Sequence, residues 1–205
     1  MYNYFKRCFD FIASLCLFVV ISPFFLILSV LVWLKLGSPI FFKQERSGLN
    51  GKTFHILKFR TMTNAKDKDG NLLPDEERFV PFGKWLRSSS LDELPELLNI
   101  IKGDMAVIGP RPLPPIYNDF YTDYEKNRFK VRGGLIPPES MYFDSFVTWD
   151  KQLKYEADYA NNLSFMLDLK LLFSVFKTIF KRTETGYGEY VREALSIERA
   201  NKKEK

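Results

Sequence analysis

The chain has 205 residues, a formal net charge of +5 and a hydrophobic fraction of 46%, with 20 phenylalanines. This length is enough for one compact domain with its own core in addition to a membrane segment. The positive charge favours an anionic partner, either phospholipid headgroups or a phosphorylated substrate. No stretch interleaves aromatic and basic residues as a nucleic-acid-binding module does, so nucleic acid is not expected as a partner.

The segment from Phe11 to Leu34 carries no charged residue and has the pair Ser22-Pro23 near its centre. At about 1.5 Å per residue, it is long enough to cross the ~30 Å hydrocarbon core of a bilayer. Pro23 removes a backbone donor and kinks a helix, and both flanks are basic, so the positive-inside rule assigns neither end to the outer side. We therefore expect residues 1–36 to form a re-entrant helix–break–helix. Its apolar part exceeds the ~7–15 residues of a signal peptide, so we expect it to be retained.

Cysteine and histidine chemistry is not expected. Cys8 and Cys16 would lie about 12 Å apart along a helix, whereas a disulfide needs Cα atoms within about 7 Å. The rest of the chain has no cysteine, which fits a reducing compartment and excludes a cysteine-based metal site. His55 is the only histidine. It lies in an apolar β-like run and is predicted to be a packed residue, so a zinc site or a Ser-His triad is not expected.

The remainder predicts an α+β, mostly helical catalytic domain over residues 37–185 and a charged tail over residues 186–205. Two β-like runs within residues 40–62 flank the turn Gly48-Leu49-Asn50-Gly51 and predict a hairpin. Residues 64–77 have no periodicity and predict a surface loop. Four helices are expected, at residues 79–89, 91–102, 116–128 and 163–182. A proline-rich extended segment is expected at residues 110–115 and an irregular segment at residues 133–150.

The pattern over residues 163–182 has two interpretations. Its polar residues recur at spacings of four, three and four, which places on one face Lys170, Ser174, Lys177 and Lys181. A core helix with one solvated stripe would show this pattern, and so would an amphipathic helix lying in the bilayer interface with its lysines reaching the headgroups. Because a membrane anchor precedes it, the interfacial interpretation is favoured. The charged tail beyond Thr183 is predicted to be frayed.

Residues 90–95 read Ser-Leu-Asp-Glu-Leu-Pro. Taken alone, Ser90 and Glu93 predict a capping box at a helix N-terminus. The surrounding sequence adds a second interpretation, because four cations lie within a short distance along the chain: Lys58, Arg60, Arg87 and Arg111. Adjacent carboxylates among fixed cations could bind a phosphate and Mg²⁺ together, since Mg²⁺ commonly uses one or two carboxylates plus substrate phosphates. A carboxylate can also attack phosphorus.

These motifs resemble the bacterial sugar transferase family, the small monotopic phosphoglycosyl transferases. The resemblance rests on motifs that occur in order through most of the chain, among them Lys58-Phe59-Arg60-Thr61-Met62, Leu91-Asp92-Glu93-Leu94-Pro95 and Ile108-Gly109-Pro110-Arg111-Pro112. Shorter matching segments are residues 6–10, 22–23, 37–44, 86–87, 96–99, 103–105 and 168–170.

The resemblance implies transfer of a phospho-sugar from a UDP-sugar to a polyprenol phosphate such as undecaprenyl phosphate, with release of UMP and a requirement for Mg²⁺. Asp92 would be the nucleophile and a metal ligand, and Glu93 would assist it. Arg111, with Pro112, would bind phosphate, because a guanidinium offers bidentate contacts. The remaining phosphates or lipid headgroups would be bound by Arg87, Lys58, Arg60 and Thr61. Asp168 would either reach the substrate–metal site or cap its own helix. Each cation has an alternative role in a surface ion pair.

One segment departs from the family pattern, which reads Val-Arg-Pro-Gly-(Ile/Leu)-Thr-Gly followed by Ala-Gln-Val. Residues 131–140 read Val-Arg-Gly-Gly-Leu-Ile-Pro-Pro-Glu-Ser. Glycine replaces the first proline, and the Thr-Gly turn is missing. We therefore expect that the sugar, or the way it is held, differs from that in relatives that match the pattern.

The expected protein is a monotopic enzyme on the cytoplasmic face of a bacterial inner membrane, in contact with phospholipid, which starts the assembly of a lipid-linked glycan or polysaccharide. Two other function classes remain open. One is an enzyme that transfers only the sugar and releases UDP; the other is a non-catalytic scaffold that binds anionic lipid. The sequence leaves the oligomeric state open, with a homo-oligomer as one alternative.

Overall fold

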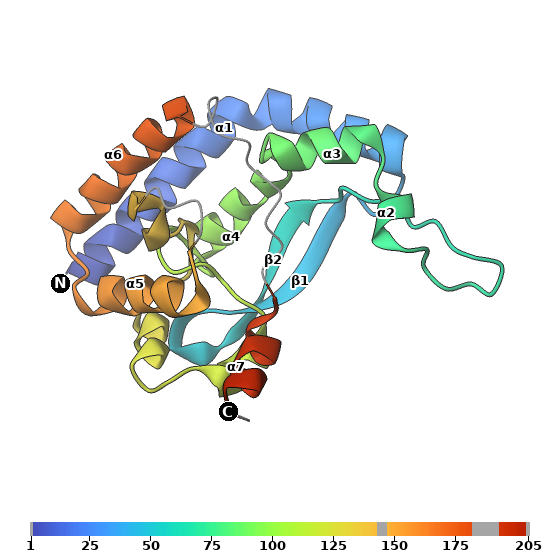
Figure 1. The fold of residues 1–205 in the computed structure, drawn as a ribbon. Coiled ribbons are helices and arrows are strands. Elements are labelled where there is room, and N and C mark those ends of the chain that lie inside the picture. Colours follow the sequence, from blue (N-terminus) through green and yellow to red (C-terminus); the bar gives the residue numbers. More distant parts are fainter. Residues whose placement is uncertain (1, 143–146, 182–192, 204–205) are drawn as a thin grey trace. The chain divides into compact units, whose positions relative to one another are not determined.

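Figure 1 shows a computed structural model of the chain, which describes residues 2–142, 147–181 and 193–203. The chain divides into two units, each treated by itself below. We call residues 11–44 and 55–102 the dyad unit, because it contains Asp92 and Glu93. We call residues 1–10, 45–54 and 103–205 the Arg111 unit. The expectation of a mostly helical α+β chain is confirmed.

The N-terminal helix α1 (Tyr2–Leu36) runs through Pro23 without interruption, so the expected break between two helices is absent. Its ribbon changes direction near the middle (Figure 1). Pro23 has no N–H to donate to the carbonyl of Val19, and the Ser22 hydroxyl donates to that carbonyl instead, at 2.8 Å. Such a serine lets a helix contain proline in an apolar environment, where a free carbonyl is costly.

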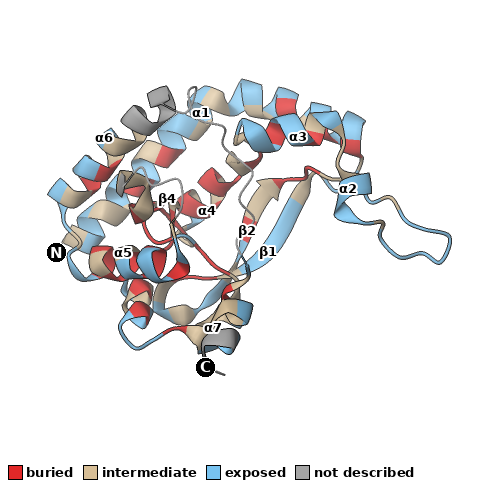
Figure 2. Ribbon diagram, viewed as in Figure 1, coloured by how far each residue is buried: buried red, intermediate tan, exposed pale blue. Residues whose placement is uncertain are grey.

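Most of α1 is exposed (Figure 2). An 18-residue window has a mean hydropathy of 2.9 with 11% of it buried, so by length and composition this helix could cross a membrane. Both cysteines lie on it, free and exposed, as the helical spacing predicted.

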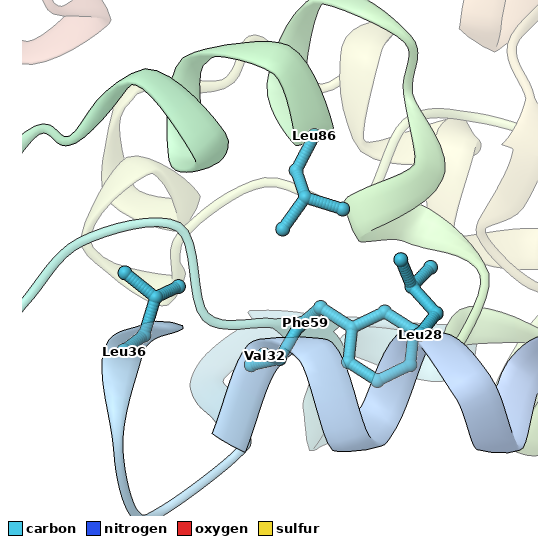
Figure 3. Close-up of a cluster of buried hydrophobic side chains, with 5 residues drawn as sticks. All are labelled: Leu28, Val32, Leu36, Phe59 and Leu86. Carbon is cyan, nitrogen blue, oxygen red and sulfur yellow. The ribbon is translucent and has the colours of Figure 1, made fainter. Parts of the chain in front are cut away.

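The buried stripe of α1 forms the core of the dyad unit. Leu28, Val32 and Leu36 repeat at a spacing of four and so lie on one helix face. They pack with Phe59 and Leu86 (Figure 3). The ring of Phe59 also lies against the rings of Phe25 and Phe41, with centroids 5.0 and 5.6 Å away.

The predicted hairpin is confirmed: strands β1 (Phe41–Ser47) and β2 (Thr53–Phe59) are hydrogen-bonded neighbours joined by the short 3-10 helix η1 (Leu49–Gly51). The expected loop follows, closed by a bridge between Lys66 and Leu72 and ending in a short helix α2 (Asp75–Arg78), which the sequence analysis did not predict.

Helix α3 (Pro81–Ser88) agrees with the predicted helix at 79–89. The helix predicted over residues 91–102 is wrong in its first turn. The chain forms a 3-10 helix η2 (Leu91–Glu93) and then α4 (Glu96–Lys102), because Pro95 cannot donate the hydrogen bond that would join them.

In the Arg111 unit, strand β3 (Ala106–Ile108) pairs in parallel with β4 (Gly134–Ile136). The prediction of an irregular segment at 133–150 missed this strand. Glycine permits the pairing, since a Cβ on Gly134 would lie 2.1 Å from the backbone nitrogen of Gly109. The 3-10 helix η5 (Pro138–Tyr142) follows β4.

The helix predicted at 116–128 is also wrong: that region forms two 3-10 helices, η3 (Pro115–Phe120) and η4 (Glu125–Lys130), separated by an extended residue at Tyr121. Helix α5 (Trp149–Asn161) was not predicted. Helix α6 (Phe165–Lys181) confirms the helix expected at 163–182. The side chains of Lys177 and Lys181 lie outside the described residues, so its interfacial role stays a prediction.

The described part of the tail is folded, contrary to the expectation of fraying. Helix α7 (Leu195–Lys203) buries Leu195 against Trp149 and Leu153. Arg199 makes contacts of 2.7 Å with both Glu125 and Asp150. These long-range contacts stabilise a segment whose own composition favours solvent.

We predict that Phe59→Ala lowers the free energy of unfolding by about 3–5 kcal/mol, since it leaves a cavity where a buried ring packed. Phe59→Leu should cost less. Chemical denaturation in detergent micelles measures both. Phe42→Ala is the control, because Phe42 lies on the neighbouring strand with an exposed ring. An equal loss for Phe42→Ala would contradict the proposed core.

Candidate functional site

The dyad unit holds a cluster of one lysine and three carboxylates. The Nζ of Lys58, on β2, lies 2.6 Å from Glu93 Oε1 and 3.3 Å from Glu96 Oε1. Glu96 is buried and Glu93 is partly exposed. One cation thus holds two carboxylates that lie three residues apart across Pro95.

Asp92 is the third carboxylate, and it lies in the short 3-10 helix η2 with 7% of its surface exposed. The neighbouring Leu91 and Leu94 pack on the apolar cluster, which fixes the turn that carries Asp92. Among the residues that the structure describes, Asp92 makes no ion pair within 4.0 Å, in contrast to Glu93 and Glu96. Asp92 is therefore the carboxylate of the cluster that is left to react or bind.

The backbone before the dyad is unusual. Ser90 has φ 56° and ψ 17°, in the left-handed region that few non-glycine residues adopt. Its side chain makes no capping hydrogen bond, and Glu93 contacts Lys58 instead, so the capping box is wrong. Residues held in such conformations are concentrated at functional sites.

Burial raises the pKa of Asp92, Lys58 lowers it, Glu93 raises it and Arg87 lowers it, with a net rise above the usual value. For Lys58, burial acts to lower the pKa, but Glu93 and Glu96 outweigh it and the pKa is raised. Lys58 thus stays charged, while Asp92 is a less stable anion than an exposed aspartate.

Arg87 and Thr61 lie together in the same unit. An Arg87 Nη is 3.5 Å from the hydroxyl of Thr61, and the guanidinium lies over the ring of Phe79, 4.6 Å from its centroid. The charge of Arg87 therefore lowers the pKa of Asp92, and the face of the Phe79 ring positions the guanidinium.

Arg60 has a different environment from the other predicted cations. It is buried, and its Nη1 donates to the carbonyl of Ser38 at 3.0 Å, in the turn that follows α1. Burial and the nearby Arg78 lower its pKa. The contact with Ser38 supports a role in fastening β2 to the end of α1.

In the Arg111 unit, the side chain of Arg111 is 54% exposed, and its Nε lies 3.7 Å from Glu139 Oε1. Pro112 is buried and lies against Gly133, where a Cβ would meet Pro112 Cγ at 2.6 Å. Gly133 is the residue that replaces the family's first proline. The substitution thus bears directly on how the Arg111-Pro112 segment packs.

Asp168 is also in the Arg111 unit, in the first turn of α6. Its carboxylate accepts hydrogen bonds from the hydroxyls of Tyr2 and Tyr159, both at 2.6 Å, and lies 3.0 Å from Lys6 Nζ. Its oxygens are thus engaged by protein groups. This favours a structural role that joins the start of α1 to α5 and α6.

Sequence reasoning missed Glu96 and Asn99, both buried on α4. A sequence signal for Glu96 existed, because in the helix predicted over residues 91–102 it would share a face with Glu93, three residues earlier. The side-chain amide of Asn99 makes two hydrogen bonds to the backbone of β2. It accepts from the N–H of Leu57 at 2.9 Å and donates to the carbonyl of His55 at 2.8 Å. The side chain of His55 is exposed, so its prediction as a packed residue is wrong.

Helix α1 could cross a membrane by length and composition, and Asp92 is a buried carboxylate near Lys58 and Arg87. The family described as bacterial sugar transferase matches residues 1–182. The chain is 44% identical over 167 residues to "Uncharacterized sugar transferase EpsL" of Bacillus subtilis (strain 168), which covers 82% of this chain and 83% of that protein.

Two further relatives are longer than this chain. One is "UDP-glucose:undecaprenyl-phosphate glucose-1-phosphate transferase" of Klebsiella pneumoniae, 34% identical over 187 residues, with 86% of this chain and 40% of that protein covered. The other is "UDP-N-acetylgalactosamine-undecaprenyl-phosphate N-acetylgalactosaminephosphotransferase" of Aeromonas hydrophila, 31% identical over 196 residues, with 92% and 45% covered. The chain belongs to the bacterial sugar transferase family. The expected enzyme class, a phosphoglycosyl transferase, is confirmed by this relationship.

We predict that Asp92→Asn raises the melting temperature at pH 7. The raised pKa means that the folded state holds a proton more tightly than the unfolded state, so the ionised carboxylate lowers stability as the pH rises above the unfolded value. The gain should shrink as the pH falls toward the ordinary pKa of an aspartate, because the unfolded state then takes up the proton as well. About 1 kcal/mol corresponds to roughly 2–4 °C in a chain of this size.

Differential scanning fluorimetry from pH 4 to pH 8 measures this effect. Asp69→Asn, in the exposed loop, is the matched control and should show no such gain. A lower melting temperature for Asp92→Asn at pH 7 would show that the carboxylate has a stabilising partner.

Proposed function

We propose that this enzyme transfers a sugar 1-phosphate from a UDP-sugar to a polyprenol phosphate, with undecaprenyl phosphate as the acceptor, and releases UMP. The names of the relatives support both substrates. The observation that carries the proposal is Asp92, a buried carboxylate with no ion-pair partner in the described part of the chain, next to two carboxylates that share Lys58.

The proposed reaction has two displacements at one phosphorus. An Asp92 oxygen attacks the β-phosphorus of the UDP-sugar, and the bond from this phosphorus to the bridging oxygen breaks, so that UMP leaves with that oxygen. An oxygen of the polyprenol phosphate then attacks the same phosphorus, and the bond to Asp92 breaks. Glu93 and Lys58 would hold the turn in place, and Arg111 would bind phosphate bidentately.

Mg²⁺ fits this arrangement as an ion bound jointly by Asp92 and the substrate phosphates. In the residues that the structure describes, no group of three His, Cys, Asp or Glu side chains could hold a metal, and Lys58 occupies Glu93 and Glu96. The protein would then offer one carboxylate, Asp92, with substrate phosphates as the other ligands, which is a common mode for Mg²⁺. When bound, the ion would offset the negative charge of the phosphates.

We predict that the purified protein releases UMP from a UDP-sugar when undecaprenyl phosphate is present. Asp92→Asn should reduce this rate by roughly three orders of magnitude or more, as removal of a nucleophile does, without loss of folded protein. A coupled UMP assay across a panel of UDP-sugars measures both the reaction class and the sugar preference.

Other products would favour the other function classes. Release of UDP would indicate transfer of the sugar alone, and release of neither nucleotide across the panel would indicate a scaffold. Near-normal UMP release by Asp92→Asn would contradict a covalent role for Asp92. Loss of activity on chelation of divalent metal, restored by added Mg²⁺, is expected.

We further propose that α1 enters the membrane and returns to the same face, so that both ends lie on the cytoplasmic side. UDP-sugars are cytoplasmic, and the catalytic residues follow α1, which assigns its C-terminal end to that side. The basic residues Lys6 and Arg7 favour the same side for the N-terminus. The hydrogen bond from Ser22 to Val19 supports a bend at Pro23 within the bilayer.

We predict that replacing Ser22-Pro23 with Leu-Leu straightens α1 and moves the N-terminus to the periplasmic side. Labelling of an N-terminal cysteine tag in a Cys8→Ser, Cys16→Ser background, by an impermeant reagent in intact cells, measures the change. Ser29→Ala is the matched control, since the Ser29 hydroxyl also bonds a helix carbonyl, that of Phe25, away from any proline. A tag that stays protected in the Leu-Leu variant would contradict the proposed bend.

A further inference from the structure

The backbone of Arg111 is held from two sides within its own unit. Its N–H donates to Glu156 Oε1 at 3.1 Å, and its carbonyl accepts from Arg128 Nη2. Arg128 and Glu156 pair at 2.8 Å with side chains 2% and 0% exposed, and Gln152 also donates to Glu156. Both backbone polar groups of Arg111 are therefore hydrogen-bonded, and the direction of its side chain depends on other contacts.

Glu139 lies beside that side chain. It is near the start of η5, its side chain is 14% exposed and its Oε1 is 3.7 Å from Arg111 Nε. Its other oxygen, Oε2, is buried without a hydrogen-bond partner in the part of the chain that the structure describes. Glu139 thus faces the inner nitrogen of a guanidinium that is half exposed, and one of its own oxygens is unsatisfied.

We propose that Glu139 is a positioning residue that holds the Arg111 guanidinium for a phosphate group of the nucleotide-sugar and takes up a proton when that phosphate binds. This inference rests on the proposed function, which assigns phosphate binding to Arg111.

The charges of the cluster support the proton uptake. Arg111 and Arg128 are balanced by Glu139 and Glu156, and an arriving phosphate adds negative charge to this balance. Burial, followed by Glu156, raises the pKa of Glu139 to about 7, against the lowering effects of Arg111 and Arg128. A phosphate that engages Arg111 weakens the lowering effect and raises that pKa further, so Glu139 gains a proton near neutral pH.

This proton uptake makes the affinity for the nucleotide-sugar depend on pH. Above pH 7, ionised Glu139 places a negative charge beside the arriving phosphate, so binding weakens as the pH rises, by at most roughly tenfold per pH unit for one coupled proton. Below pH 7, neutral Glu139 removes this repulsion. Glu139 also lies in residues 131–140, the segment in which the sequence departs from the family pattern.

Isothermal titration calorimetry of UDP-glucose, UDP-galactose and UDP-N-acetylgalactosamine tests the proposal on full-length Asp92→Asn protein, which does not consume the ligand. The phosphates of these ligands do not titrate between pH 6 and pH 8. Titrations in buffers of different ionisation enthalpy give the number of protons taken up. We expect net uptake near pH 7 for the best-binding ligand and an affinity that falls several-fold from pH 6 to pH 8.

Adding Glu139→Gln should abolish the uptake and flatten the pH dependence while keeping the pH 6 affinity, since glutamine resembles the protonated acid. Glu139→Asp should retain some uptake, and Asp123→Asn, an exposed carboxylate paired with Lys126, should change nothing. Unchanged proton uptake in the Glu139→Gln variant would overturn the inference, and so would a loss of that variant's affinity at pH 6. Absence of proton uptake both with and without the Glu139→Gln substitution would also overturn it. The unsubstituted protein is titrated alongside, because Asp92 is also the proposed Mg²⁺ ligand. No binding of any of these ligands to either the unsubstituted or the Asp92→Asn protein would overturn the proposed function and this inference with it.

Discussion

The ion pair of Lys58 with Glu93 and Glu96 is the interaction on which the dyad depends. Lys58 and Phe59 are neighbours on a strand, so their side chains point to opposite faces. Phe59 is buried against the apolar stripe of α1, and Lys58 contacts the two carboxylates. Asn99 adds a second connection between the same strand and α4. One strand therefore contacts both the buried stripe of α1 and the carboxylates.

The local structure around Asp92 is costly in free energy. A buried carboxylate with a raised pKa and a left-handed residue two positions earlier both cost free energy. A fixed lysine and an arginine held on an aromatic ring keep positive charge near it without an ion pair that would occupy its oxygens. The oxygens of Asp92 therefore stay outside the ion pairs of the residues that the structure describes.

The sequence predicted those elements that repeat along the chain: the apolar helix, the hairpin, α3 and α6. The roles of Asp92 and Glu93, which rest on a family motif, stay predictions. The sequence could not predict features that depend on distant partners. Strand β4 is three residues long and exists because glycines let β3 approach, and α7 is ordered by Leu195 and Arg199, whose partners lie far away in the sequence. For the same reason, the contacts of Asp168 and Glu139 carried no signal in the motif.

In the proposed function, Asp92 carries the phospho-sugar between the two substrates. Intact-protein mass spectrometry after acid quenching, with a turned-over UDP-sugar and Mg²⁺ but no polyprenol phosphate, tests this most directly. We expect a mass increase of one phospho-sugar per chain that disappears when undecaprenyl phosphate is added and is absent in Asp92→Asn. An enzyme that turns over with polyprenol phosphate but never shows this adduct, or an adduct that persists in Asp92→Asn, would contradict it.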